Sequence, residues 1–379
     1  MVLPIAVRHP ELWTDASTVG RLSALLGFLT GDAWDLRFSP CGGAPGSSAG
    51  QVGLPFSLRD APKAVALFSG GLDSLAGAAA HLGAGRGALL LVSGEGSSRQ
   101  AAVQRFLAHA LLRAFPALVG HIWERYGGLV EPVGAGEVSG RARGFLFLAL
   151  GAAAALRAGI GELLVFENGV GAINLPYDES QLGADHSRAV HPRTLREFGD
   201  LVGVLSGREF RVVNPCLWAT KGEMLSVPSV RGLAQALRAS FSCDGFPVRV
   251  RGKSQCGFCT SCLLRRLSLE TAGTDDPGCG YLWDCRGAGF PPDRHHQRGI
   301  AAMEWQALRL QRCLAASEPW PALRREFPAL RGAARELGRE FGQASAEAGL
   351  VRLYARHVEE WRAFSGRASL ARTGGGRAA

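Results

Sequence analysis

A glycine-rich segment at residues 69–74, here called the glycine loop, has the residue types of an anion-binding turn. It reads Ser-Gly-Gly-Leu-Asp-Ser and directly follows a short apolar run at residues 64–68. Adjacent glycines let backbone amides approach an anion closely, and the start of a following helix adds partial positive charge. The segment lacks the lysine of a Walker loop and does not read G-x-G-x-x-G. We therefore expect a phosphate-binding turn, and the alternative is a tight strand-to-helix turn without a ligand.

Four cysteines have the spacing of a metal site. Cys256, Cys259 and Cys262 are each separated by two residues, and Cys243 lies a short distance upstream. Four thiolates can surround Zn²⁺ as a tetrahedron. The alternatives are an iron–sulfur cluster and a redox pair. Because closed four-cysteine sites are typical of structural zinc, we expect Zn²⁺ here, fixing the end of the domain that carries the glycine loop.

Short apolar runs alternate with helical patterns after residue 60, and this order predicts an α/β fold with a doubly wound parallel sheet. Strands are expected at residues 64–68, 88–92, 129–133, 162–166 and 210–214, and helices at 75–82, 99–115 and 143–158. Ligands of such sheets gather at the carboxyl ends of the strands. The glycine loop follows the first strand, and Glu167 and Asn168 follow the fourth. These two side chains are therefore candidates for binding a substrate.

The composition divides the chain into three parts. Residues 1–60 form an N-terminal extension, with strands expected at 4–8 and 35–38. Residues 61–287 form the main domain, which includes the zinc-binding segment at 243–262. Residues 288–379 form a helical C-terminal extension, with helical periodicity at 301–316, 322–341 and 345–367. We expect these helices to pack on the main domain or to bind a partner.

The 379 residues carry a formal charge of +9, which suits nucleic-acid binding, binding of small anions, or plain solubility. We consider nucleic acid the less favoured partner. Nearly all the basic residues are arginine, and lysine occurs only at positions 63, 221 and 253. A lysine retained in this background suggests that a compact ammonium group is needed, which draws attention to Lys221. No apolar run reaches the roughly 20 residues of a membrane span, and no signal-peptide pattern is present, so we expect a cytoplasmic enzyme.

A polar loop at residues 185–193 is a further candidate for contact with an anionic substrate. It holds His186 and His191 together with Arg188 and Arg193. The alternative is a solvated loop without a binding role.

Two of these motifs resemble known families. The glycine loop resembles the S-G-G-x-D-S signature of the PP-loop ATP pyrophosphatases, which cleave ATP to AMP and pyrophosphate. With the cysteine pattern S-C-x(n)-C-G-x-C-x-x-C-L-x-R, the chain resembles the QueC family, which makes 7-cyano-7-deazaguanine from 7-carboxy-7-deazaguanine. Residues 140–150 resemble the family's R-N-x-x-F-L-x-L helix, with Arg143 at the arginine, and residues 214–223 resemble its P-x-x-x-x-x-K-x-E segment, with Lys221 at the lysine.

The resemblance covers about residues 63–270 and implies a role for each matched residue. Asp73 would orient the loop or help to hold Mg²⁺. Lys221 would stabilise the α-phosphate or the carbonyl oxygen of the adenylate, and Arg143 would be a further catalytic residue. The loop would hold the phosphates of ATP through its hydroxyls and amides, at Ser69, Gly70, Gly71, Leu72 and Ser74. The chain departs from the family pattern at residues 94–100 and at 167–177, where Glu167 matches.

The resemblance also implies a reaction. The carboxylate of 7-carboxy-7-deazaguanine would be activated by ATP as an adenylate and then form an amide with an amine. Extended QueC-like proteins form a branch found in bacterial antiviral defence systems, including Qat and type IV CBASS, in which the amine can be the N-terminus of a partner protein. Ammonia as the acceptor would give 7-cyano-7-deazaguanine instead. A PP-loop enzyme that modifies tRNA, a nucleotide-binding subunit without catalysis, and assembly as a homodimer are left open.

Overall fold

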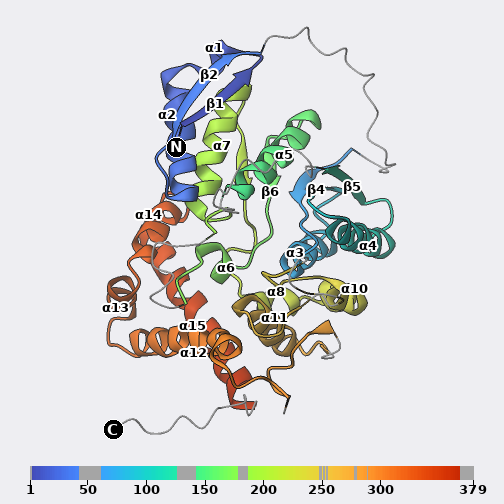
Figure 1. Ribbon diagram of the computed structural model, residues 1–379, viewed down its shortest axis with the longest axis vertical. Coiled ribbons are helices and arrows are strands. Elements are labelled where there is room, and N and C mark those ends of the chain that lie inside the picture. Colours follow the sequence, from blue (N-terminus) through green and yellow to red (C-terminus); the bar gives the residue numbers. More distant parts are fainter. Residues whose placement is uncertain are drawn as a thin grey trace.

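The computed structural model describes residues 2–41, 61–125, 142–177, 187–246, 250, 252, 255–276, 280–287 and 289–367 (Figure 1). Its centre is a five-stranded sheet in the order β5-β4-β3-β6-β7, and every pair of neighbouring strands is parallel. The strands are β3 (Ala64–Leu67), β4 (Leu89–Glu95), β5 (Val119–Arg125), β6 (Glu162–Leu164) and β7 (Arg211–Val213). The chain builds outward from β3 on one side and then returns to its other side with β6. The carboxyl ends of β3 and β6 therefore border the switch point of the sheet, where ligands of such folds bind.

Both faces of the sheet are covered by helices, as the continuous apolar strands require. Ala64 and Ala66 of β3 face a cluster that contains α3 (Leu72–Gly83) and α4 (Ser98–Ala114). Val65 faces the opposite cluster, which contains α5 (Arg143–Arg157) and α7 (Pro192–Ser206). The predicted α/β fold with a parallel sheet is confirmed.

One sheet strand was not expected from the sequence. β5 (Val119–Arg125) forms an edge of the sheet, and its burial declines from Val119 at one end to exposed residues at the other. An edge strand that is only half buried produces no continuous apolar run, so it lacks the pattern that identified β3 and β4. The strand expected at 129–133 lies outside the described residues.

The N-terminal residues form a separate two-stranded parallel sheet of β1 (Val2–Val7) and β2 (Asp35–Pro40), joined through α1 (Pro10–Trp13) and α2 (Ala16–Thr30). α2 packs on α7, and their leucines share one apolar cluster. Part of the polar loop at 185–193 docks here as well. The guanidinium groups of Arg188 and Arg193 lie over the ring of Phe28, at 4.9 and 4.4 Å from its centre.

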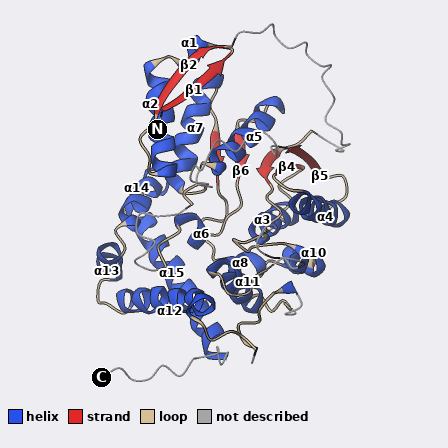
Figure 2. Cartoon of the chain, viewed as in Figure 1, coloured by secondary structure: helices blue, strands red, loops and turns tan. Residues whose placement is uncertain are grey.

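Helices lie on the carboxyl-end side of the sheet, and the last of them ends at Arg367 (Figures 1 and 2). The predicted helix at 322–341 is two helices, because the chain breaks at Phe327 and Pro328. Among the described residues, no helix combines the length and apolarity needed to cross a bilayer. The helices not yet named are α6 (Gly169–Ile173), α8 (Lys221–Leu225), α9 (Pro228–Arg231), α10 (Ala234–Ala239), α11 (Thr260–Thr271), α12 (Arg294–Leu314), α13 (Pro319–Glu326), α14 (Ala329–Phe341) and α15 (Gln343–Arg367).

Candidate functional site

The glycine loop forms the turn from β3 into α3. Gly70 has φ +81°, a conformation that favours glycine, and a Cβ there would lie 2.9 Å from Cγ of Gln104. Gly71 caps α3, and its amide donates to Oγ of Ser69 at 3.1 Å. The hydroxyls of Ser69 and Ser74 lie 3.2 Å apart. The loop thus places two hydroxyls together at the amino end of a twelve-residue helix, as the sequence predicted.

Two residues that the sequence did not single out hold the backbone of the glycine loop. The hydroxyl of Ser93 donates to the carbonyl of Phe68 at 2.6 Å. The amide Nε2 of Gln104 donates to the carbonyls of Ser69 and Gly94, at 3.1 and 3.2 Å. Gln104 is buried, and the only hint in the sequence was its polar side chain on the inward face of α4.

Asp73 lies at the centre of a buried polar cluster. Nζ of Lys221 lies 2.7 Å from Oδ2 of Asp73. Nδ2 of Asn168 donates to Oδ1 of Asp73 at 3.1 Å and to Oε1 of Glu167 at 2.8 Å. The structure therefore brings together four predicted site residues from three distant segments: the start of α3, the loop after β6 and the start of α8.

The cluster contains two carboxyl groups and one ammonium group in a largely dry environment. Burial and the nearby Asp73 carboxylate raise the pKa of Glu167 to about 8, against the opposing effects of Lys221 and of the hydrogen bonds from Asn168. Burial alone would lower the pKa of Lys221, but Asp73 and Glu167 raise it above its usual value. Lys221 is therefore a fixed positive charge beside the glycine loop. Both carboxylate oxygens of Asp73 are engaged, so its role in this arrangement is to orient Lys221.

Helix α8 is well defined at its start. Thr220 caps the helix by accepting from the amide of Glu223 at 3.1 Å, and Oε2 of Glu223 accepts from the amide of Thr220 at 2.9 Å. This reciprocal capping box fixes the backbone of the residue that precedes Lys221.

A cavity of about 170 Å³ opens beside the glycine loop. Ser69, Ser74 and Glu167 line one part of it, and most of the remaining lining is apolar, including Phe147 and Val165. The cavity combines long apolar walls with a few polar groups, which is the usual make-up of a small-molecule site.

Arg143 stands apart from this cluster. It is the first residue of α5 and is exposed. Arg143 does not line the cavity, although Gly144 and Phe147 of the same helix do. Within the described part of the chain, no hydrogen bond or ion pair joins Arg143 to Asp73 or Lys221.

His191 of the polar loop has a structural position. Its Nδ1 accepts from the amide of Arg193 at the start of α7, and its ring packs edge-on against Phe28 of α2. Burial and the nearby Arg188 lower the pKa of His191 to about 4, so the ring is neutral at physiological pH. His186 lies outside the described residues.

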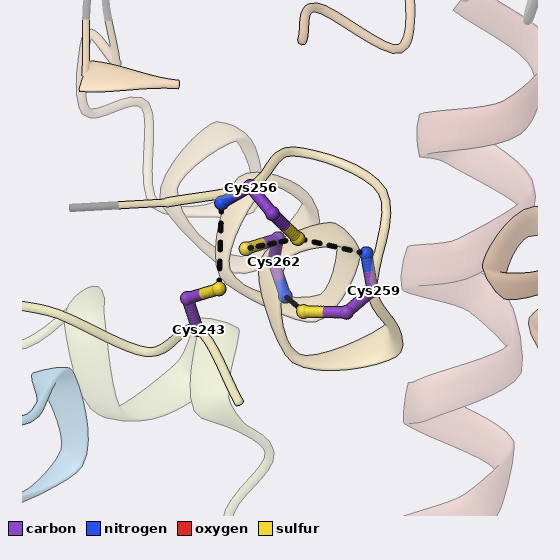
Figure 3. Close-up of side chains that lie close together, drawn as sticks. All are labelled: Cys243, Cys256, Cys259 and Cys262. Atoms are coloured by element: carbon purple, nitrogen blue, oxygen red, sulfur yellow. Dashed lines mark hydrogen bonds between the residues drawn. The ribbon is translucent and has the colours of Figure 1, made fainter. Parts of the chain in front are cut away.

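The four cysteines form one cluster (Figure 3). Their sulfur atoms all lie within 4.8 Å of one another, and those of Cys256 and Cys262 are 3.7 Å apart. Tetrahedral zinc with bonds of about 2.3 Å requires sulfurs about 3.8 Å apart, so the donor set fits Zn²⁺. Backbone amides donate to the sulfurs, from Cys259 to Cys256 and from Cys262 to Cys259. The structure thus confirms that the four cysteines predicted as metal ligands lie together.

The cysteine cluster is connected to the glycine loop through residues 240–242. Gln255, next to Cys256, donates through Nε2 to the carbonyl of Ser240 and accepts through Oε1 from the amide of Ser242. Between them, the amide of Phe241 donates to the carbonyl of Gly70 at 3.4 Å. A metal ion in the cluster would therefore fix the strand-like segment that lies against the loop.

The chain was also compared with known proteins. It matches no protein-family model and no curated protein sequence. What is established is an α/β protein with a parallel five-stranded sheet and a four-cysteine cluster that fits Zn²⁺.

Proposed function

We propose that this protein is an ATP-using enzyme that activates a carboxylate as an adenylate, with the phosphates of ATP held by the glycine loop. The observation that carries the proposal is the buried Asp73–Lys221 pair, which lies beside the loop at the switch point of the sheet. A positive charge fixed next to loop amides at a helix start is suited to a phosphate group.

In the proposed reaction, a carboxylate oxygen attacks the α-phosphate of ATP, and the bond to the leaving pyrophosphate breaks. Negative charge develops on the phosphate oxygens during this step. The amide of Gly70 and the ammonium of Lys221 are oriented before the reaction, so they stabilise that charge without reorganisation. The amide of Gly71 donates to Oγ of Ser69 and would have to leave it to join them. Mg²⁺ bound with ATP would neutralise the pyrophosphate. An amine then attacks the acyl carbon, AMP leaves, and an amide forms.

The resemblance to the QueC family suggests 7-carboxy-7-deazaguanine as the carboxylate. The largely apolar lining of the cavity suits a flat ring, with Glu167 among the polar residues of the lining and Asn168 behind it, donating to Oε1 of Glu167. Glu167 is a carboxyl group with a pKa near 8, so in its protonated form it can donate to a ring acceptor. The amine acceptor is the N-terminus of a partner protein of a bacterial antiviral defence system, or ammonia.

The cysteine cluster would hold a structural zinc ion. Four cysteines leave no open coordination position, which distinguishes structural from catalytic zinc sites. Its supporting contacts run through Phe241 to the glycine loop, so the metal would stabilise the nucleotide site without touching the substrate.

The test is pyrophosphate exchange into ATP by the purified, zinc-loaded chain in the presence of 7-carboxy-7-deazaguanine. We expect exchange that depends on the carboxylate, and its loss in Lys221→Met. Lys63→Met is the matched control, because Lys63 is exposed and directly precedes β3, at the end of that strand opposite the glycine loop. Binding of ATP without exchange, for every deazaguanine tried, would indicate a nucleotide-binding subunit and overturn the proposal. Mass spectrometry of the products would then identify the acceptor.

The charge of +9 favours a second candidate, a PP-loop enzyme that acts on tRNA. Thiolation of tRNA requires a reactive cysteine near the loop, and Cys216 lies close enough to the polar cluster for Asp73 and Glu167 to act on the pKa of its thiol. Burial, then Asp73 and Glu167, raise the pKa of Cys216 to about 12, so its thiol is a poor nucleophile. Formation of a tRNA adduct that survives high salt would favour this candidate.

A further inference from the structure

Helix α15 of the C-terminal extension lies against both segments that hold Asp73. It passes beside α6 and reaches α8 and α11 (Figure 1). At Gly169, the residue after Asn168, a Cβ would lie 2.7 Å from Cδ2 of Leu353. At Gly222, the residue after Lys221, a Cβ would lie 2.6 Å from Oε1 of Glu360. At Gly169 the carbonyl oxygen of Leu217 would be nearer still, at 2.0 Å, and at Gly222 Cγ2 of Thr271 would lie 2.8 Å away. Helix α15 is therefore one of two close neighbours of the backbone at each of these glycines.

Two side chains of α15 contact the capping box of α8. Oε1 of Glu360 accepts from the hydroxyl of Thr220, whose single proton is thereby used. Nε of Arg356 donates to Oε1 of Glu223 at 3.2 Å. Helix α15 therefore contacts both partners of the capping box, Thr220 one residue before Lys221 and Glu223 two residues after it.

The Glu360 carboxyl group is buried, and its Oε2 has no hydrogen-bond partner among the residues that the structure describes. The pKa of Glu360 is raised to about 7, chiefly by burial and also by the nearby Glu223 and Glu359. The hydrogen bond from Thr220 and the charge of Arg356 oppose this rise. The ammonium of Lys221 faces Asp73 and Glu167, with the cationic Arg265 also near. Burial of a carboxyl group with one unsatisfied oxygen costs free energy. The hydrogen bond that positions Thr220 gives a reason for a glutamate at position 360 in spite of this cost.

We infer that Glu360 is a positioning residue for Lys221: through Thr220 it fixes the start of α8, so that the C-terminal extension completes the Asp73–Lys221 site. The inference rests on the proposed function only in assigning Lys221 to the stabilisation of charge on the phosphate oxygens. The geometric claim concerns the ion pair itself and can be tested without a substrate.

The test is nuclear magnetic resonance of the full zinc-loaded chain with ¹⁵N-labelled lysine. The chain has lysine only at 63, 221 and 253, so loss of one ammonium signal in Lys221→Arg assigns it. We expect exchange of the Lys221 ammonium protons with water to rise by about tenfold in Glu360→Ala, which corresponds to about 1.4 kcal/mol of weakened pairing. Glu360→Gln keeps the acceptor oxygen and should restore the wild-type rate. Arg362→Ala, which removes an exposed charge from the same helix, is the control.

A Lys221 signal in Glu360→Ala that exchanges as in the wild type, even with a lower melting temperature, would show that Glu360 only stabilises the fold and would overturn the inference. If Glu360→Ala does not fold, Glu360→Asp serves instead, because the shorter side chain withdraws its carboxylate from Thr220. Binding of Mg-ATP by the same variants is a separate measurement. Absence of ATP binding in the wild type would refute the proposed function and leave the result on Lys221 standing.

Discussion

Removing Lys221 should destabilise the protein more than removing its partner Asp73. Two unit charges 2.7 Å apart attract by about 6 kcal/mol at an effective dielectric constant of about 20. Desolvation offsets much of this attraction, and removal of one partner of a buried pair typically costs about 3–5 kcal/mol. In Lys221→Met, Asp73 is left buried without a cation, and Glu167 cannot help because it is also acidic. We expect a loss of about 4 kcal/mol.

Asp73→Asn should cost about half as much, about 2 kcal/mol. The asparagine oxygen can still accept from Asn168, and Lys221 keeps Glu167 as a counterion. Loss of the Asp73 charge also lowers the pKa of Glu167, because a like charge next to it has been removed, so Glu167 ionises more readily and compensates Lys221. The asymmetry between the two variants follows from this third charged group.

The assay is urea unfolding followed by tryptophan fluorescence, with the two single variants and the double variant forming a cycle. Measurements at about pH 9 and about pH 6 add a second check, since Glu167, whose pKa is about 8, is protonated at the lower pH, and the loss of its attraction to Lys221 should reduce the cost of Lys221→Met. Equal costs for the two single variants, or a cost below about 1 kcal/mol for Lys221→Met, would refute the account of a buried Asp73–Lys221 pair with Glu167 as a second counterion.

Three further predictions address the loop, the metal and the C-terminal helix. Gly70→Ala should cost about 1–2 kcal/mol of stability and abolish Mg-ATP binding. Gly159→Ala is the control, because Gly159 has φ +73° and an added Cβ would meet no described atom within 4 Å, so this variant should lose stability alone. Equal ATP binding by the two variants would count against the loop. Elemental analysis should find a single zinc ion per chain that is lost in Cys262→Ser, and iron with sulfide would contradict this. The folded-state pKa of Glu360, about 7, exceeds its ordinary 4.5, so its contribution favours folding at low pH and is lost as the pH rises from 4.5 to 7. Glu360→Gln should therefore be more stable than the wild type at about pH 8, by up to about 3 kcal/mol, and similar at about pH 5; thermal unfolding that shows no such difference would contradict the raised pKa.

The buried strands and the glycine loop were predictable because they depend on local patterns. β3 and β4 are continuous apolar runs, and parallel strands covered on both faces require such runs. The edge strand β5 and the division of one predicted helix at Pro328 were missed, since the first is half exposed and the second depends on a single break in a helical pattern. The cysteine spacing predicted the cluster because three of its ligands come from one short segment.

The amino-acid sequence alone determined the residue types of the glycine loop and of the cysteine cluster, and an order of strands that places the glycine loop and Glu167 at the same end of a parallel sheet. The tertiary structure decided which of these residues meet. Asp73 and Lys221 are 148 positions apart, and only the return of the chain from β3 to β6 and β7 brings them into contact. Arg143 was assigned by resemblance but is exposed at the start of α5. The contacts of Glu360 and Gln104 depend on helix packing, which leaves no local signal in the sequence, because a buried polar residue looks like any other until its partner is known.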